Sequence, residues 1–226
     1  ATLKNYHLSP KEFFKIKGET DSLNASIIKP FNFDPTKKYP VYVHVYGGPG
    51  SNTVLNKFKG SEYLFHQLLA QNGYIVLSID PRGTMYRGAE FKKSTYLNLG
   101  KLELQDILTA TNNFYENNSF VDSTRLGIQG WSFGGYLSSL AMTKGDKLFK
   151  IGIAVAPVTN WRYYDNIYTE RFMRTPQENE KGYDDNSPIN FVKDLTGKYL
   201  LIHGSADDNV HLQNTMELIE ELVQSN

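Results

Sequence analysis

The sequence predicts an α/β fold, built from a mostly parallel central sheet with helices on both faces. From residue 41 onward, short segments of apolar and β-branched residues alternate with longer segments of helical period. Strands that are apolar on both faces are typical of parallel sheets, because helices cover both sides of such sheets. Hydrophobic residues make up 40% and charged residues 21% of the 226 residues, as in a globular domain rather than a disordered chain.

Two apolar segments near the amino terminus, 13–16 and 25–28, are expected to be strands. No helical segment separates them, so we expect them to form an antiparallel edge of the sheet. The strands expected in the alternating part of the chain are 41–46, 75–79, 126–129, 151–155 and 199–203. We therefore expect an amino-terminal arm with the edge strands, 1–38, and an α/β core, 39–226, which together form one domain.

The segments between these strands have the period of amphipathic helices. The apolar positions that define them are Leu64, Phe65, Leu68 and Leu69 in the first, Leu104, Ile107, Leu108, Phe114 and Tyr115 in the second, Leu137, Leu140 and Ala141 in the third, and Leu212, Met216, Ile219 and Val223 in the last. The segment 160–195 breaks this rhythm, because it is rich in Tyr, Asp, Asn and Pro. We expect it to form an irregular, partly helical excursion over one end of the sheet, where α/β folds commonly build their sites.

Composition excludes several classes of function. The chain has 24 basic and 24 acidic residues, so its zero net charge gives no electrostatic argument for binding nucleic acid. It has no cysteine, which excludes disulfides, thiolate nucleophiles and cysteine-ligated metal centres. No apolar run approaches the roughly 20 residues of a membrane-spanning helix. Residues 1–4 do not resemble a signal peptide.

One motif carries recognisable chemistry. Residues 130–134 read Gly-Trp-Ser-Phe-Gly, which matches the pattern G-x-S-x-G. The pattern alone is common, but here it lies between an expected strand and an expected helix, where α/β-hydrolases place a nucleophile on a sharp turn. The glycines leave room for that turn, and the start of the helix directs free amides at a developing oxyanion. Ser132 is therefore the candidate nucleophile; the alternative is a glycine-rich turn with a capping serine.

A serine nucleophile needs a base, and the base needs an acid to orient it. In α/β-hydrolases these residues follow in the order Ser, acid, His. The last expected strand, 199–203, is followed at once by Gly-Ser-Ala-Asp-Asp-Asn, 204–209, which offers a carboxylate at the right place in that order. The alternative is that residues 207–209 only cap the last helix.

Several stretches of the chain resemble the prolyl oligopeptidase family of serine peptidases, and within it the dipeptidyl peptidase IV branch. The stretches are Gly-Trp-Ser-Phe-Gly-Gly-Tyr (130–136), Tyr-Gly-Gly-Pro-Gly (46–50), Asp-Pro-Arg-Gly-Thr (80–84), Phe-Val-Asp (120–122), Gly-Ile-Ala-Val-Ala-Pro-Val-Thr-Asn-Trp-Arg-Tyr-Tyr-Asp-Asn-Ile-Tyr-Thr-Glu-Arg (152–171) and His-Gly-Ser-Ala-Asp-Asp-Asn-Val-His (203–211). They follow the family's order along nearly the whole chain, which makes the resemblance specific. It implies the α/β-hydrolase fold.

The resemblance also implies roles for individual residues. Ser132 would be the nucleophile and Asp207 the triad acid, while the Tyr46 phenol and the backbone amide of Phe133 would form the oxyanion hole. The pocket for the residue before the scissile bond, suited to the compact ring of proline, would be formed by Val158, Trp161, Tyr164, Tyr168 and Val210. Asn209 would hydrogen-bond a backbone carbonyl of the substrate. Without the resemblance, Tyr46 would be interpreted as a core aromatic, and the pocket equally well as an aromatic cluster covering the core.

The sequence departs from the family pattern at its carboxyl end. The triad His should follow the acid after one more strand, but the chain stops at Asn226 in an expected helix. The histidines present are His7, His44, His66, His203 and His211. His203 and His211 match family positions other than the base and are expected to be structural. We therefore expect a C-terminally truncated α/β-hydrolase domain that lacks the last strand, the triad His and the last helix. Such a chain should have little or no activity and should expose a sheet edge and apolar faces.

The leading hypothesis is a serine exopeptidase domain that releases amino-terminal Xaa-Pro or Xaa-Ala dipeptides through an acyl-enzyme on Ser132, with no metal or cofactor. The stretch Tyr-Tyr-x-x-x-Tyr-Thr-Glu-Arg, 163–171, favours the dipeptidyl peptidase branch. The alternatives are an acylaminoacyl or endo-acting member of the family, or a non-catalytic interaction module on the same fold. A binding module has no need of Ser132, Asp207 and Tyr46 together, which argues against the last alternative.

The resemblance implies partners as well. The substrate would be a peptide with proline or alanine at the second position. An amino-terminal β-propeller, absent from this sequence, would supply the acidic residues that hold the free amino group of the substrate. The full-length chain would form a homodimer and would not bind nucleic acid. The family is often extracellular, periplasmic or membrane-anchored, but the sequence leaves the location of this protein unknown.

Overall fold

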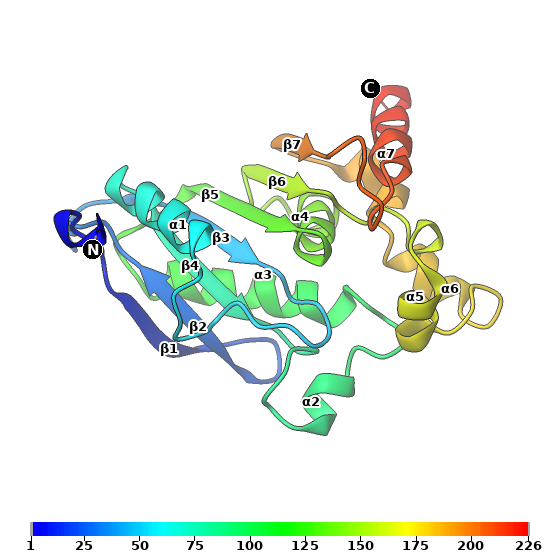
Figure 1. Cartoon of the computed structure of the whole chain (residues 1–226), viewed down its shortest axis with the longest axis horizontal. Helices are drawn as coiled ribbons and strands as arrows, with labels where there is room; N and C mark the ends of the chain where they lie inside the picture. Colours follow the sequence, from blue (N-terminus) through cyan, green and yellow to red (C-terminus); the bar gives the residue numbers. More distant parts are fainter. Residues whose placement is uncertain (1, 226) are drawn as a thin grey trace.

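The fold is organised around a sheet of seven strands in the order β1-β2-β4-β3-β5-β6-β7 (Figure 1). This computed structural model describes residues 2–225. The strands are β1 (Lys11–Lys17), β2 (Ser22–Ile28), β3 (Tyr39–Val45), β4 (Ile75–Asp80), β5 (Val121–Trp131), β6 (Ile151–Val155) and β7 (Lys198–Ile202). β2 pairs antiparallel with both β1 and β4, whereas β4, β3, β5, β6 and β7 are parallel. The predicted antiparallel edge and mostly parallel sheet are confirmed.

Helices and short 3-10 segments connect the strands. They are η1 (Thr2–Asn5), α1 (Ser61–Gln71), α2 (Ala89–Lys93), α3 (Lys101–Glu116), α4 (Phe133–Lys144), η2 (Trp161–Tyr163), α5 (Asn166–Met173), α6 (Glu180–Asp185), η3 (Pro188–Asp194) and α7 (Gln213–Gln224). The predicted helices correspond to α1, α3, α4 and α7, and the excursion 160–195 contains η2, α5, α6 and η3. The sequence did not predict α2, a helix of five residues in which only Phe91 is buried, because it has no apolar period.

Different helices cover the two faces of the sheet, because side chains alternate between the faces along each strand. On β3, Val43 points into the main core, to which α3 and α4 contribute. Its neighbour Tyr42 points the other way, into a smaller cluster with Ala70 of α1. Figure 1 shows α1 in front of the sheet and α3 behind it. The prediction of helices on both faces is therefore confirmed.

The apolar stripes that define α1 and α7 in the sequence are largely exposed. Phe65 of α1 is 48% exposed and Val223 of α7 is 72% exposed. The buried faces of these helices combine one apolar core residue each, Ala70 on α1 and Leu218 on α7, with hydrogen-bonded polar groups. Gln67 of α1 exchanges two hydrogen bonds with the backbone of Ser9, and Asn214 of α7 accepts one from the loop after β6. Satisfied polar groups can be buried at little cost, so the docking faces of these helices differ from the stripes that the sequence indicates.

Apolar surface is also exposed on the last strand of the sheet. β7 forms the edge beyond β6, and Leu200 and Ile202 on it are about half exposed. Within the part of the chain that the structure describes, no helix has the length and apolar character needed to cross a membrane.

Candidate active site

The carboxyl ends of the parallel strands bring the candidate residues together. β3, β5, β6 and β7 run in register, so Val45 lies beside Gly130, Trp131 beside Val155, and Val155 beside Ile202. The carboxyl ends of all four strands lie along the same end of the sheet (Figure 1). The loops that leave this end carry Tyr46, Ser132, the aromatic segment after β6 and the acidic segment after β7. Site residues that are far apart in the sequence therefore share one end of the sheet.

Ser132 occupies a sharp turn between β5 and α4. Its backbone has φ 58° and ψ −117°, which is a strained conformation for any residue with a side chain. The turn is held from both sides, because the Ser132 amide donates to Val155 O at 2.8 Å and the Tyr136 amide donates to Ser132 O at 2.9 Å. The surrounding structure thus forces the serine into a conformation that the isolated chain would avoid.

The glycines around Ser132 have a steric explanation. A Cβ at Gly130 would collide with the backbone of Gly134, and a Cβ at Gly134 would collide with Val45 O. A Cβ at Gly135 would lie 2.7 Å from Val155 O. Each glycine therefore lets α4 begin directly against the ends of β3, β5 and β6. The predicted nucleophile turn is present, with the serine at its apex.

Two hydrogen-bond donors lie beside Ser132. The Tyr46 phenol lies close enough to the Ser132 side chain for the serine to influence its pKa, and burial, the larger effect, raises that pKa and keeps the phenol protonated. The Phe133 amide is the first of α4, a helix with no side-chain cap at its start. The Tyr46 and Phe133 rings lie 6.2 Å apart. A Cβ at Gly48 would lie 2.8 Å from the Tyr46 ring, so glycine there lets this ring approach the serine turn.

Aromatic side chains form a wall next to the serine turn. Trp161 stacks on Tyr168 with centroids 6.4 Å apart, and Tyr164 meets Tyr168 edge-on at 5.3 Å. Phe133 lies 5.7 Å from Trp161, which connects the wall to the turn. Val158, Trp161 and Val210 are buried in the main core, and Tyr164 and Tyr168 pack against that core. The structure thus brings the three predicted aromatic residues of the pocket, Trp161, Tyr164 and Tyr168, into contact with one another.

The acidic loop after β7 is rigidly held. Asp207 Oδ1 accepts hydrogen bonds from the amides of Asn209 and Val210, both at 3.0 Å. Asn209 Oδ1 in turn accepts from the Tyr164 phenol at 2.8 Å, which ties the loop to the aromatic wall. Helix α7 begins after Leu212 and has no side-chain cap, so the alternative that this loop only caps the last helix is wrong.

The histidine nearest the acid is already engaged. His203 Nε2 lies 3.7 Å from Asp207 Oδ2, but it lies 2.7 Å from Val210 O. The other ring nitrogen, Nδ1, lies 2.7 Å from Thr215 Oγ1. Both nitrogens therefore have partners within the acidic loop and α7, which fits the structural role expected for His203.

Two further histidines are buried away from the candidate triad. His44 of β3 and His66 of α1 face each other with ring centroids 4.7 Å apart. Burial lowers the pKa of both, and that of His66 falls to about 3. The Glu62 carboxylate, 3.8 Å from His44, partly opposes this effect for His44. Among residues 2–225, no histidine hydrogen-bonds both Asp207 and Ser132.

The sequence did not single out the buried polar groups behind the aromatic wall. Tyr136 is fully buried, and its phenol oxygen lies 2.7 Å from the carbonyl oxygens of Leu99 and Asn186. Glu103 is also fully buried, although a glutamate on a helix is usually interpreted as a surface residue. The one available signal was its position three residues after Gly100, where a glutamate can cap the start of a helix.

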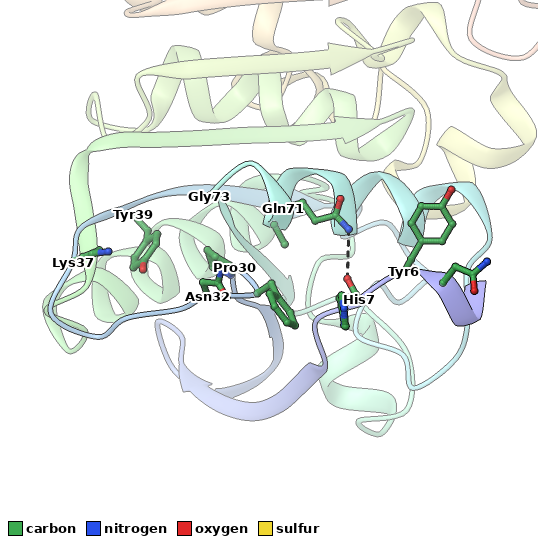
Figure 2. A pocket seen from close by; sticks show the side chains of 11 residues that line it. Tyr6, His7, Pro30, Asn32, Lys37, Tyr39, Gln71 and Gly73 are labelled. Carbon is green, nitrogen blue, oxygen red and sulfur yellow. Dashed lines mark hydrogen bonds between the residues drawn. The ribbon is translucent and has the colours of Figure 1, made fainter. Parts of the chain in front are cut away.

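A separate cavity of about 590 Å³ lies at the opposite end of the sheet (Figure 2). Its lining includes Tyr39 at the start of β3 and Gly73 just before β4, so it lies at the amino ends of the parallel strands. The Gln71 amide donates to the His7 carbonyl there at 3.4 Å. None of the predicted site residues lines this cavity.

The profile of the prolyl oligopeptidase family matches residues 62–226 of the chain. A probable dipeptidyl-aminopeptidase B of Trichophyton verrucosum is 48% identical over 199 residues, which cover 86% of this chain and 22% of that protein. A prolyl endopeptidase FAP of Bos taurus is 42% identical over 226 residues, which cover 99% of this chain and 29% of that protein. The chain thus spans between a fifth and a third of the length of these curated relatives.

Two solved structures of dipeptidyl peptidases are also similar to this chain. The crystal structure of Porphyromonas gingivalis dipeptidyl peptidase 4 matches with a TM-score of 0.95 and 47% identity, over all of this chain and 32% of that one. The structure of a putative dipeptidyl aminopeptidase IV from Bacteroides ovatus matches with a TM-score of 0.94 and 36% identity, over the same shares. At these identities the similarity extends beyond the fold.

Proposed function

The chain belongs to the prolyl oligopeptidase family and has its α/β-hydrolase fold, and from this premise we propose that it is the catalytic part of a serine dipeptidyl peptidase. The substrate is a peptide with proline or alanine at the second position from its amino terminus. The observation that carries the proposal is the position of Ser132, strained at the start of α4 between the Tyr46 phenol and the aromatic wall. Residues 39–226 form the catalytic core in this proposal, and 1–38 supply the arm and edge strands.

In the proposed reaction, Ser132 Oγ attacks the carbonyl carbon of the second residue of the substrate, whose bond to the following amine breaks. The hydroxyl proton passes to a histidine base oriented by Asp207, and then to the leaving amine. The negative charge on the carbonyl oxygen is stabilised by the Tyr46 phenol and the Phe133 amide. Water then hydrolyses the acyl-enzyme and releases the dipeptide.

The aromatic wall explains the proposed preference. Proline is compact and has no N–H to satisfy, so it suits a pocket lined by Val158, Trp161 and Tyr168. Alanine occupies less of the same space. Asn209 completes the pocket: its Oδ1 already accepts from Tyr164, so its amide nitrogen is directed to donate to a substrate carbonyl.

Two proposed partners lie outside these 226 residues. A β-propeller supplies the acidic groups that hold the substrate amino terminus, and two copies of the full-length protein form a homodimer. The chain covers 22% of the dipeptidyl-aminopeptidase B relative and 32% of the dipeptidyl peptidase 4 structure, so proteins of this kind have room for a further domain.

Replacing Tyr46 with phenylalanine in the native protein is expected to lower kcat for a Gly-Pro chromogenic substrate by about 10²–10³-fold, because one oxyanion donor is lost. Tyr74→Phe is the matched control, since Tyr74 is exposed and lies next to β4 at its amino end. The measurement is kcat of both variants by steady-state kinetics. Equal kcat values for the two variants would remove Tyr46 from the oxyanion hole.

The isolated 226-residue chain is expected to react with a fluorophosphonate roughly a thousandfold or more slowly than a full-length homologue, because no described histidine is placed to take the Ser132 proton. The measurement is the rate of covalent labelling, with a thermal melt of each sample to show that it is folded. Labelling of the folded chain at the homologue's rate would contradict the proposal that the base comes from elsewhere.

The substrate class is tested on the native protein with Gly-Pro-p-nitroanilide and its N-acetylated form. Cleavage of the free form alone supports the proposed dipeptidyl peptidase. Cleavage of both forms identifies another member of the family, acylaminoacyl or endo-acting. Cleavage of neither form, by protein that binds the peptides, identifies an interaction module.

A further inference from the structure

A buried carboxyl group that takes no part in the proposed reaction lies behind the aromatic wall. Glu103, in the first turn of α3, has no exposed surface. Its Oε2 accepts a hydrogen bond from the Gly100 amide at 2.9 Å. Its Oε1 is equally buried and has no hydrogen-bond partner among the described residues. One carboxyl oxygen is thus satisfied and the other is free.

Among residues 2–225, no cation forms an ion pair with this carboxyl. The nearby Arg82 guanidinium is committed to Asp106, with Nε to Oδ2 and Nη2 to Oδ1 both at 2.9 Å. An ionised carboxylate that is buried with one N–H donor and no counter-ion is costly, so burial favours the uncharged acid at Glu103. Burial, with the Asp106 charge adding to it, raises the pKa of Glu103 to about 8, while the Gly100 amide and Arg82 oppose the shift.

Glu103 is connected to the pocket through closely packed groups. Gly100, whose amide donates to Glu103, lies directly against Tyr136: a Cβ at Gly100 would collide with the Tyr136 phenol. The Tyr136 ring lies 4.9 Å from Trp161, which is stacked on Tyr168. The phenols of Tyr136 and Tyr168 both lie within electrostatic range of the Glu103 carboxyl, since a charge there would raise the pKa of each.

We propose that Glu103 is a positioning residue of the aromatic pocket, whose protonated carboxyl keeps Tyr136, Trp161 and Tyr168 in the arrangement that binds proline; this role rests on the proposed function. Loss of the proton places a negative charge beside two phenols and leaves two carboxylate oxygens with one donor between them. The carboxylate then draws a donor or water into the wall, which displaces its aromatic rings. The charged and titratable groups that face Glu103 are Asp106 on α3, Arg82 after β4, Tyr136 on α4 and Tyr168 on α5.

The test compares the native protein with Glu103→Gln, which preserves the acceptor for Gly100 and cannot ionise. Glu116→Gln, at the exposed end of the same helix, is the matched control. The measurement is KM and kcat for Gly-Pro-p-nitroanilide from about pH 6 to 9.5. The substrate amine titrates in this range too, but it affects all three proteins alike. Above about pH 8 we expect kcat/KM of the native protein and of Glu116→Gln to fall more steeply than that of Glu103→Gln. The additional fall should be up to tenfold per pH unit and should come mainly from a rise in KM. Superimposable profiles for the three proteins would overturn the proposal.

A second readout needs no activity, so it separates this proposal from the proposed function. The chain has two tryptophans, and Trp131→Phe leaves Trp161 as the fluorophore of the 226 residues. In the 226-residue chain with this background, the Trp161 emission should change between about pH 7 and 9.5 and should stay constant once Glu103→Gln is added. An identical pH response with and without Glu103→Gln would overturn the proposal even if no peptide is cleaved. The expected difference would support it even if the substrate class is wrong.

Discussion

Replacing Ser132 with alanine in the native protein is expected to lower kcat for a Gly-Pro chromogenic substrate by roughly 10⁴-fold or more, because no acyl-enzyme can form. The melting temperature should change little, since alanine preserves the Cβ and the backbone hydrogen bonds of the turn. Residual turnover would come only from the oxyanion donors and the pocket.

Ser119→Ala is the control for this variant. Ser119 is exposed in the turn between α3 and β5, at the opposite end of β5 from Ser132. Active-site titration and steady-state kinetics should show an unchanged control and an inactive Ser132→Ala protein. Retention of more than a few per cent of the native kcat by Ser132→Ala would show that another group is the nucleophile.

Replacing Asp106 with asparagine is expected to lower the free energy of unfolding by about 3–5 kcal/mol, because it leaves the Arg82 guanidinium buried without its counter-charge. Asp106 has no exposed surface, and its carboxylate also accepts from the backbone amides of Arg82 and Glu19. Asparagine can keep some of these acceptor contacts but cannot neutralise Arg82.

Asp122→Asn provides the matched comparison, because Asp122 pairs with Arg125 on the surface at 2.7 Å. A surface pair of this kind contributes about 1 kcal/mol or less. Chemical denaturation of both variants should therefore separate them by several kcal/mol. Equal losses of stability would show that the Arg82–Asp106 pair is no more important than a surface pair.

The sheet could be predicted from the sequence because its strands carry their signal locally. β6 was predicted as 151–155 and is observed as Ile151–Val155. β5 was predicted as 126–129 but extends over Val121–Trp131, since its first half is polar and largely exposed and so has no apolar run. The apolar stripes of α1 and α7 indicated helices correctly. They could not indicate the buried face, because the docking side of α1 depends on hydrogen bonds from Gln67 to the distant Ser9.

The candidate site was predictable to the extent that its residues follow strands. Tyr46, Ser132 and Asp207 come after β3, β5 and β7, and parallel strands end at one edge. The link from Tyr164 to Asn209 depends on two loops meeting in space, which no local pattern encodes. Glu103 was missed because its burial depends on how α3 packs in the folded chain rather than on its own segment.

The central claim is that Ser132 is the nucleophile of a peptidase. The most direct measurement is to treat the native protein with a fluorophosphonate until it stops cleaving Gly-Pro-p-nitroanilide, and then to locate the adduct by mass spectrometry of its peptides. We expect one adduct per chain, on Ser132, with loss of activity in proportion to labelling. Complete inactivation with Ser132 unmodified and another residue carrying the adduct would contradict the claim.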